Sequence, residues 1–310
     1  MNSKLWKELV VSEEEEELVR KIRESGYGRT LSDEKLNEFH VAKEWDMEID
    51  TRVGKALVHL YRPTESLEKM PLFISMHGGG FVRGRRDQDI VFCRNISSRS
   101  GCMVMEVDYV PAPAMRYPGQ VYACYDILQY CGRHAEELGA DSGRIAIGGQ
   151  SAGGTLTVAV LLMAIDNGGF MPALQILSYP GLDSKTSASA RRNGTSNPDL
   201  PPQITDLFYK MYVAPELAGE PYCSPGFAAD GQLAKLPPTV IQYCENDLFC
   251  DETAEFHKRL LLQGVPVYGK HFFNSSHGFV VRRTDEYESA EAMILQALRS
   301  LHPLKKGGNG

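Results

Sequence analysis

The pattern Gly-x-Ser-x-Gly around Ser151 constrains the fold of this chain more than any other feature. An apolar run ends in two glycines just before the serine, and a second apolar run follows it. A serine on such a sharp strand-to-helix turn has a strained backbone, which is tolerated where Gly149 and Gly153 lack side chains. A helix beginning at Ala152 would aim free N–H groups at an oxyanion beside Ser151. The pattern is short and also occurs by chance, so it predicts a nucleophile elbow only within a strand-turn-helix context.

Composition and charge limit the class of protein. The chain has 310 residues, 43% of them hydrophobic and 24% charged, which is typical of a soluble globular protein. Its formal net charge of −7 argues against binding nucleic acid, because neutralising phosphates requires an excess of Lys and Arg. The nearest approaches to a basic cluster are residues 83–86, with three arginines, and the pair Lys305-Lys306.

The cysteines and the apolar runs indicate a cytoplasmic protein. The seven cysteines are odd in number, scattered and never spaced as C-x-x-C, which favours buried, reduced thiols over disulfides or a zinc site. Residues 1–26 are rich in Glu and lack the apolar core of a signal peptide. The most apolar run, residues 156–165, is too short to span a bilayer, so no stable membrane insertion is expected.

Strand-like and helix-like segments alternate as in an α/β protein. The first two strand-like segments suggest an antiparallel hairpin, and the others suggest a mostly parallel sheet of eight strands flanked by helices. The expected strands are residues 41–49, 55–61, 72–76, 103–107, the run beginning at Ile145, 173–178, 239–244 and 265–273. The expected helices include residues 87–100, 120–138, 251–263 and 284–301.

Two regions interrupt this alternation. Residues 5–25 have amphipathic helical spacing around a run of glutamates, which we interpret as a solvated face. Residues 184–236 contain no strand-helix unit and are interpreted as an insertion between strands. Within the insertion, residues 204–212 carry aromatic side chains at helical spacing, which fits core packing and a substrate-facing lid helix equally well.

A nucleophilic serine requires a base and an acid downstream of it. A serine hydroxyl needs an imidazole to accept its proton and a group that fixes the tautomer of that imidazole. His277 follows the last predicted strand, and Asp247 lies between a strand end and a helix start, where functional groups collect in such sheets. Asp251 and Glu252 have a structural explanation, since acidic residues are favoured in the first turn of a helix.

The glycine-rich segment His77-Gly78-Gly79-Gly80-Phe81 follows another predicted strand. Successive glycines let the backbone approach a substrate closely and direct N–H groups into a site. Such a segment after the third strand forms an oxyanion hole in some hydrolases, and two donors here would join the N–H of Ala152. A simple tight turn is the alternative interpretation.

Four motifs in this order resemble the hormone-sensitive-lipase-like family of α/β-hydrolase esterases, of the bacterial carboxylesterase or acetyl esterase type. Residues 77–81 match its H-G-G-G-F motif, and residues 149–154 match its G-D-S-A-G-G motif. Residues 247–252 resemble its D-P-L-R-D-E motif, and residues 277–279 match its H-G-F motif. Gln150 departs from the family pattern, which has an acid before the serine, and residues 108–114 keep only part of its D-Y-R-L-A-P-E motif.

The resemblance implies an α/β-hydrolase fold and assigns roles to individual residues. The implied triad is Ser151, Asp247 and His277; the implied oxyanion donors are the backbones of Gly79, Gly80 and Ala152; and Phe81 is an expected substrate-binding residue. It also implies a helical cap made of residues 1–40 and of the insertion 184–236. The core would then comprise residues 41–183 and 237–304, followed by a flexible tail, residues 305–310. Family members often dimerise, so a homodimer is expected.

These expectations combine into a carboxylic-ester hydrolase that acts on short acyl chains through an acyl-enzyme, with no metal or organic cofactor. An amidase or arylformamidase with the same triad is the nearest alternative. A non-catalytic ligand receptor on the same fold is a further alternative, against which the presence of His277 argues, because the plant gibberellin receptors have lost that histidine.

Overall fold

A computed structural model describes residues 11–24, 30–66, 68–193 and 200–302. Eight strands form one sheet in the order β1-β2-β4-β3-β5-β6-β7-β8. The pairs β1–β2 and β2–β4 are antiparallel and all others are parallel, which confirms the predicted mostly parallel sheet. The strands are β1 (Lys43–Thr51), β2 (Gly54–Arg62), β3 (Met70–Met76), β4 (Met103–Asp108), β5 (Ala140–Gln150), β6 (Leu174–Ser178), β7 (Thr239–Asn246) and β8 (Val267–Ser276).

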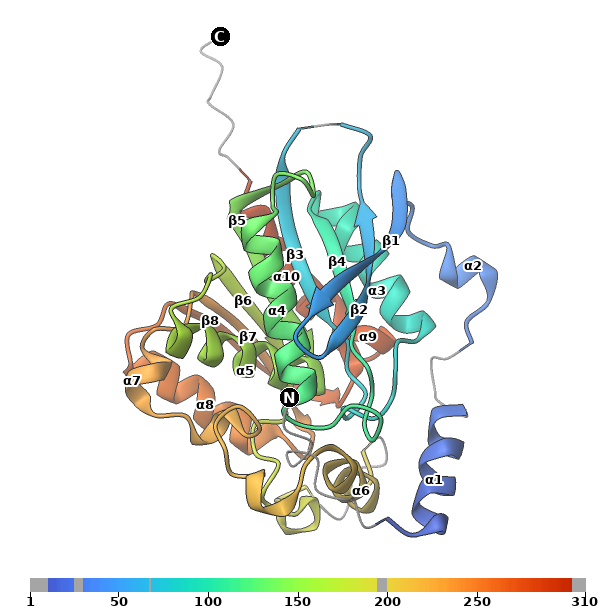
Figure 1. Cartoon of the computed structure of the whole chain (residues 1–310), viewed down its shortest axis with the longest axis vertical. Helices are drawn as coiled ribbons and strands as arrows, with labels where there is room; N and C mark the ends of the chain where they lie inside the picture. Colours follow the sequence, from blue (N-terminus) through green and yellow to red (C-terminus); the bar gives the residue numbers. More distant parts are fainter. Residues whose placement is uncertain (1–10, 25–29, 67, 194–199, 303–310) are drawn as a thin grey trace.

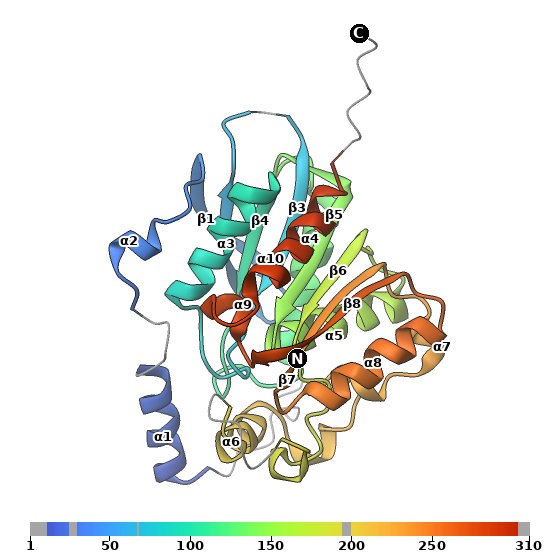
Figure 2. The ribbon, with the colours of Figure 1, turned by 180° about the vertical axis from the view of Figure 1, so that it is seen from behind.

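Helices cover both faces of the sheet (Figures 1 and 2). One face carries α4 (Gly119–Arg133), α5 (Ala152–Asn167) and α8 (Cys250–Leu262). The other carries α3 (Asp87–Ser100), α10 (Tyr287–Arg299) and the short α9 (Phe279–Arg282). The central strands therefore lie between two apolar layers, which explains why β3 is buried along its whole length.

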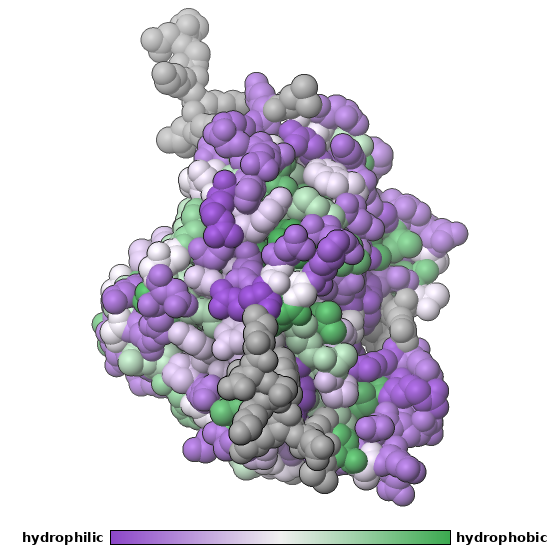
Figure 3. All heavy atoms as spheres, viewed as in Figure 1, coloured by the Kyte–Doolittle hydropathy of each residue, from purple (hydrophilic) through white to green (hydrophobic). Residues whose placement is uncertain are grey.

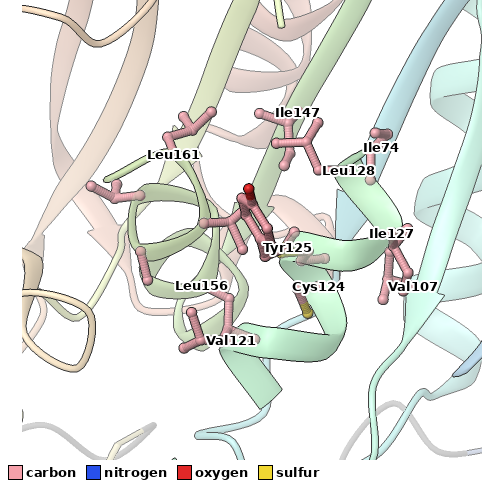
Figure 4. Packing of buried hydrophobic residues seen from close by; sticks show 14 of the residues in the cluster. Ile74, Val107, Val121, Cys124, Tyr125, Ile127, Leu128, Ile147, Leu156 and Leu161 are labelled. Carbon is pink, nitrogen blue, oxygen red and sulfur yellow. The ribbon is translucent and has the colours of Figure 1, made fainter. Parts of the chain in front are cut away.

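The apolar run after Ser151 is explained by the packing of α5. Its residues 152–164 are all buried, because α5 packs against the sheet, against α4 beside it and against residues 225–233 of the insertion. Figure 4 shows Val121 of α4 beside Leu156 of α5, and Leu128 of α4 beside Ile147 of β5. Both helices are thus fixed against the sheet, and the N-terminus of α5 is held at the carboxyl end of β5.

Some predicted boundaries were wrong. The helix predicted at residues 120–138 ends at Arg133, and β5 begins at Ala140, five residues before the predicted start. The first part of β5 includes Asp141, Ser142, Gly143 and Arg144, which lack apolar alternation, so sequence patterning could not identify it as strand. The helix predicted at 284–301 is shorter, and the short helices α2 (Asp33–Leu36) and α9 were not predicted.

The insertion and the N-terminal segment lie together beside the sheet. The described part of residues 184–236 contains no strand; it contains α6 (Pro202–Tyr212), α7 (Asp230–Leu233) and three short 3₁₀ turns, Ala188–Ala190, Pro215–Leu217 and Pro225–Phe227. Val19 of α1 (Glu13–Glu24) packs in one apolar cluster with Leu207, Phe208 and Met211 of α6. Lys210 also forms an ion pair with Glu15, at 2.7 Å.

The outer face of α1 is hydrophilic (Figure 3), as the solvated-face interpretation of the glutamates predicts. Parts of the segments assigned from the sequence, residues 1–10, 25–29, 194–199 and the tail 305–310, lie outside the described residues.

Candidate active site

Ser151 occupies the turn between β5 and α5 in a backbone conformation that is rare for a residue with a side chain. Its φ is 53° and its ψ is −122°, and its N–H donates to the carbonyl oxygen of Ser178 at 2.9 Å. A Cβ atom on Gly149 would lie 2.4 Å from the carbonyl carbon of Gly153. A Cβ on Gly153 would lie only 1.9 Å from the carbonyl oxygen of Met76. Both glycines are therefore required by close backbone packing around the turn.

The structure brings Ser151, His277 and Asp247 into one hydrogen-bonded chain. The Nε2 atom of His277 lies 2.9 Å from Ser151 Oγ, and its Nδ1 atom lies 2.8 Å from Asp247 Oδ2. His277 follows β8, and Asp247 follows β7, so both come from the carboxyl ends of parallel strands. All three side chains are buried, and Asp247 is 1% exposed. In this geometry the imidazole can accept the proton of the serine while the carboxylate fixes its tautomer.

Aromatic rings hold the His277 imidazole in place. Tyr179 and Phe249 meet it edge to face, with centroids 5.0 and 5.3 Å away. The second oxygen of the Asp247 carboxylate, Oδ1, accepts a hydrogen bond from the N–H of Phe249 at 3.1 Å. Tyr179 and Phe249 thus restrict the orientation of the His277 ring, and Phe249 also restricts that of the Asp247 carboxylate.

The two acids that follow this loop in α8, Asp251 and Glu252, have different partners. Asp251 forms an ion pair with Arg192 at 3.0 Å, and Glu252 forms one with Arg191 at 2.5 Å. Glu252 also accepts a hydrogen bond from the N–H of Leu182 at 2.5 Å. Both acids do lie in the first turn of α8, but Glu252 additionally ties that helix to the segment that enters the insertion.

The glycine segment after β3 forms a turn beside Ser151. The carbonyl of Gly79 accepts hydrogen bonds from the N–H groups of Val82 and Arg83 at 3.2 and 2.9 Å. No described residue accepts a hydrogen bond from the N–H of Gly79, Gly80 or Ala152. Three backbone donors near the serine hydroxyl are therefore available to a ligand, whereas a tight turn alone would not require them.

His77, the first residue of this segment, is fixed by its contacts with Tyr109. Its ring stacks on Tyr109 with centroids 4.2 Å apart, and the Tyr109 hydroxyl donates to the carbonyl oxygen of His77 at 2.9 Å. Phe81, the expected substrate-binding residue, lines the pocket but is only 2% exposed and stacks on Tyr212 at 3.7 Å. Most of its ring therefore packs against α6.

The pocket that contains Ser151 is lined in part by the helix for which the sequence left core packing and a substrate-facing lid as equal alternatives. Thr205, Phe208 and Tyr209 of α6 line it, while Leu207 and Met211 of the same helix pack in apolar clusters. The aromatic spacing of α6 thus combines the two alternatives, core packing and a pocket-facing wall. Further lining residues from the core are Arg83, Arg86, Gln88, Gln150, Tyr179, Phe249 and Arg282. In the sequence, Arg83 and Arg86 stood out only as members of the basic run 83–86, which did not indicate a place in the pocket.

One group of described side chains has the composition of a metal site. Ligand atoms of Glu245, Cys250 and His271 lie within 4.8 Å of one another. Arg192 contacts two of them, at 2.5 Å from Glu245 and 3.4 Å from Cys250, and so places a cation at the cluster. Burial, with the charge of Glu245 second, raises the pKa of the Cys250 thiol to about 12. This group therefore does not fit a cation well, because a thiol must be deprotonated to bind a metal.

All seven cysteines are free and buried. Among the described helices, none is both long and apolar enough to cross a membrane.

Comparisons with known proteins agree with this architecture. A family model described as "alpha/beta hydrolase fold" matches residues 73–281. The chain is 30% identical over 239 residues to the esterase LipI of Mycobacterium tuberculosis, covering 76% of this chain and 74% of LipI. It is 28% identical over 223 residues to an α/β hydrolase of Acanthamoeba polyphaga mimivirus, covering 72% of this chain and 64% of the viral protein.

Among solved structures, a hyperthermophilic esterase from the archaeon Pyrobaculum calidifontis superimposes with a TM-score of 0.84. It is 30% identical, and the match covers 91% of this chain and 93% of the archaeal one. The family model spans the glycine turn, the elbow, the acid and the histidine described above, and the fold matches over nearly the whole chain. This chain belongs to the hormone-sensitive-lipase-like family of α/β-hydrolases.

Proposed function

We propose that this protein hydrolyses carboxylic esters with short acyl chains through an acyl-enzyme. Ser151 attacks the ester carbonyl, and His277 takes its proton and passes it to the leaving alcohol. Asp247 stabilises the imidazolium that forms between these steps. Water, activated by the same imidazole, then attacks the acyl-enzyme and releases the acid. The observation that carries this proposal is the hydrogen-bonded chain from Ser151 Oγ through His277 to Asp247.

The backbone N–H groups of Gly79, Gly80 and Ala152 are proposed to stabilise the oxyanion. They have no described acceptor, and they lie on the turn and helix start that flank Ser151. Losing one such donor costs about 3 kcal/mol of transition-state stabilisation in comparable enzymes. The ion pair between Arg86 and Asp89, at 3.1 Å, supports this turn, because Arg86 also donates to the carbonyl of Gly78.

The test of the mechanism is the variant Ser151→Ala. Hydrolysis of 4-nitrophenyl acetate should fall by several orders of magnitude, because the proposed nucleophile is removed. Ser98→Ala is the matched control, since Ser98 is exposed on α3 and should retain the parent rate. A Ser151→Ala protein that hydrolysed the ester at the parent rate would refute the proposal.

Short acyl chains are proposed because the pocket is walled by large side chains. Phe208 and Tyr209 of α6 line it together with Ser151, and both are buried. In a series of 4-nitrophenyl esters, kcat/KM should be highest for acetate or butyrate and fall toward octanoate. A maximum at octanoate would contradict this part of the proposal.

The proposal assigns residues 1–40 and 184–236 to a cap over a core of residues 41–183 and 237–304. Its support is that α6 lines the pocket and that Val19 of α1 packs against α6. Deleting residues 1–24 should therefore change KM and substrate range while the fold of the core, followed by circular dichroism, persists. Loss of the core fold on this deletion would instead make the segment part of the core.

A cytoplasmic location and a homodimer complete the proposal. The seven buried free thiols support a reducing compartment. Strand β8 at the sheet edge exposes Tyr268 and Phe273, with 52% and 66% of their surfaces accessible, which supports pairing with a second copy. Sedimentation of the purified protein as a monomer at micromolar concentration would refute the homodimer.

A further inference from the structure

Arg83 places a cation in the pocket without a counter-ion. Its side chain lines the pocket that contains Ser151, and its guanidinium lies over the ring of Phe208, 5.5 Å from the centroid. The Nε atom is buried and has no hydrogen-bond partner. No ion pair joins Arg83 to any carboxylate of the described residues. A buried charged donor without an acceptor is costly, and such groups commonly serve a ligand.

The surroundings of Arg83 are positive. Arg86 and Arg282 line the same pocket, and no aspartate or glutamate occurs among its described lining residues. Arg86 is paired with Asp89, at 3.1 Å, and the nearby Asp247 is engaged by His277. Burial, followed by the charges of Arg86 and Arg282, lowers the pKa of Arg83 to about 10. The guanidinium therefore remains charged near neutral pH in a site that disfavours its charge.

The neighbouring arginine in the sequence shows what Arg83 lacks. Arg85 points to another partner: its Nε atom lies 2.8 Å from the buried carboxylate of Glu106, and its Nη2 donates to the hydroxyl of Tyr61. The three arginines of the run 83–86 thus divide into two whose charges are compensated by the protein and one, Arg83, whose charge faces the substrate pocket.

We infer that the preferred substrates are esters that carry a carboxylate, which Arg83 binds while Ser151 attacks the ester carbonyl. This inference rests on the proposed ester hydrolysis and specifies its substrate class. A planar guanidinium pairs with a carboxylate through two parallel hydrogen bonds, which the two Nη atoms of Arg83 can donate because, unlike Nε, they are not buried. The carboxylate belongs either to the acyl part, as in a monoester of a dicarboxylic acid, or to the alcohol part, as in an acylated hydroxy acid.

Two matched pairs of esters test the inference and distinguish the two positions. Monomethyl glutarate is compared with its neutral amide, methyl 4-carbamoylbutanoate, and acetoxyacetate is compared with acetoxyacetamide. Each pair differs only in replacement of the carboxylate by an uncharged group of similar shape. We expect kcat/KM, measured by proton release, to favour the anion by about tenfold or more in one pair, as for a charged hydrogen-bond pair. Preference for the amide in both pairs would overturn the inference.

Variants of Arg83 show whether this residue produces the preference. Arg83→Met keeps an apolar stem against Phe208 but removes the charge, and should reduce the ratio of anionic to neutral kcat/KM by about tenfold. Arg83→Lys should restore part of the ratio, because it keeps the charge without the planar fork. Arg133→Gln, at an exposed position in the last turn of α4, is the control and should leave the ratio unchanged. An unchanged ratio in Arg83→Met would limit Arg83 to packing on Phe208 and refute the inference.

A binding measurement separates failure of this inference from failure of the proposed function. In a calorimetric titration, the variant Ser151→Ala should bind the anion more tightly than the amide in at least one of the two pairs, and adding Arg83→Met should abolish that difference. Turnover of neutral esters without an anion preference would leave hydrolysis standing and refute the carboxylate site. A binding preference without turnover of any ester would refute hydrolysis and keep the site.

Discussion

At the scale of single residues, the environment of each side chain separates residues of the same type. Asp247 lies in the loop after β7 and Asp251 in the first turn of α8, yet the first is 1% exposed and contacts His277, while the second is exposed and contacts Arg192. The same holds for Arg83 and Arg85, which differ in whether a carboxylate lies within reach. The residue type therefore identifies candidate functional residues, and the contacts of each side chain in the folded protein distinguish those in the site from those with structural ion pairs.

Replacing Asp247 by Asn should reduce kcat for 4-nitrophenyl acetate by a factor on the order of 10⁴ at neutral pH, because the amide favours the wrong imidazole tautomer. Circular dichroism should show the parent fold. Asp251→Asn, in the first turn of α8 just after this loop, is the control and should change kcat less than about threefold, since its ion pair is exposed. Equal losses in both variants would mean that Asp247 acts through loop structure and not through His277.

Replacing Gly153 by Ala should destabilise the protein by about 3 kcal/mol or prevent folding, because the new methyl group would overlap the Met76 carbonyl. Gly231→Ala in α7 is the control, since a Cβ there has no atom within 4 Å. It should be neutral or stabilise by up to about 1 kcal/mol. Urea unfolding measures both, and a stable, active Gly153→Ala protein would contradict the close packing described for the elbow.

At the scale of elements, the hairpin β1–β2 is joined to β4 by a buried histidine. His59 of β2 contacts Asp46 of β1 at 2.7 Å and Asp108 at the end of β4 at 3.6 Å. Burial alone would lower the pKa of His59, but the carboxylates of Asp108 and Asp46 outweigh it, so the net pKa lies above the usual 6.5. Protonation of this imidazole thus strengthens its contacts with three neighbouring strands at the antiparallel end of the sheet.

This linkage gives stability a specific pH dependence. Because the native state binds the proton more tightly than the unfolded chain, the contribution of His59 is fully present below pH 6.5 and is lost as pH rises through the folded pKa. The difference in free energy of unfolding between the parent protein and His59→Gln should therefore shrink from pH 6 upward. At pH 6, the difference in free energy of unfolding between the parent and Asp46→Asn should be smaller than that between the parent and His59→Gln. Unfolding free energies that changed identically with pH in parent and His59→Gln would contradict this role.

At the scale of the whole molecule, the insertion is tied to the core close to the candidate site. Arg191, at the start of the insertion, pairs with Glu252 of α8, and its guanidinium lies 5.1 Å from the centroid of Phe249. Phe249 in turn contacts the ring of His277. A single buried ion pair therefore connects the insertion, a core helix and the base of the proposed triad.

Burial raises the pKa of Glu252 to about 8. At pH 9, where this carboxyl is ionised, Glu252→Gln should lower the free energy of unfolding by about 3 kcal/mol, because it leaves the buried Arg191 charge without its partner. It should also lower kcat, because Arg191 would no longer be held over Phe249, which contacts His277. Glu255→Gln on the same helix is the control, as its ion pair with Lys258 is exposed and contributes less than about 1 kcal/mol. Retention of parental stability in Glu252→Gln would show that this ion pair does not fasten the insertion.

The sequence by itself determined the mostly parallel eight-stranded sheet, because apolar runs of strand length separated by amphipathic helices have few other ways to bury their surfaces. It also predicted Ser151, Asp247 and His277 as partners, since each follows a strand whose carboxyl end must reach the same edge of the sheet. The glycines at positions 149 and 153 likewise predicted the close backbone packing of this turn, because a side chain at either position would overlap backbone atoms.

Only the tertiary structure decided how charges and cap are placed. Arg83 and Arg85 are two residues apart and identical in type, so no local pattern distinguishes the arginine paired with Glu106 from the one in the pocket. Glu252 likewise fits its helix terminus by sequence, but its ion pair with Arg191 joins residues 61 positions apart. Strand and helix periodicity records which surfaces are buried, whereas the partner of a charge depends on distant segments that folding brings together.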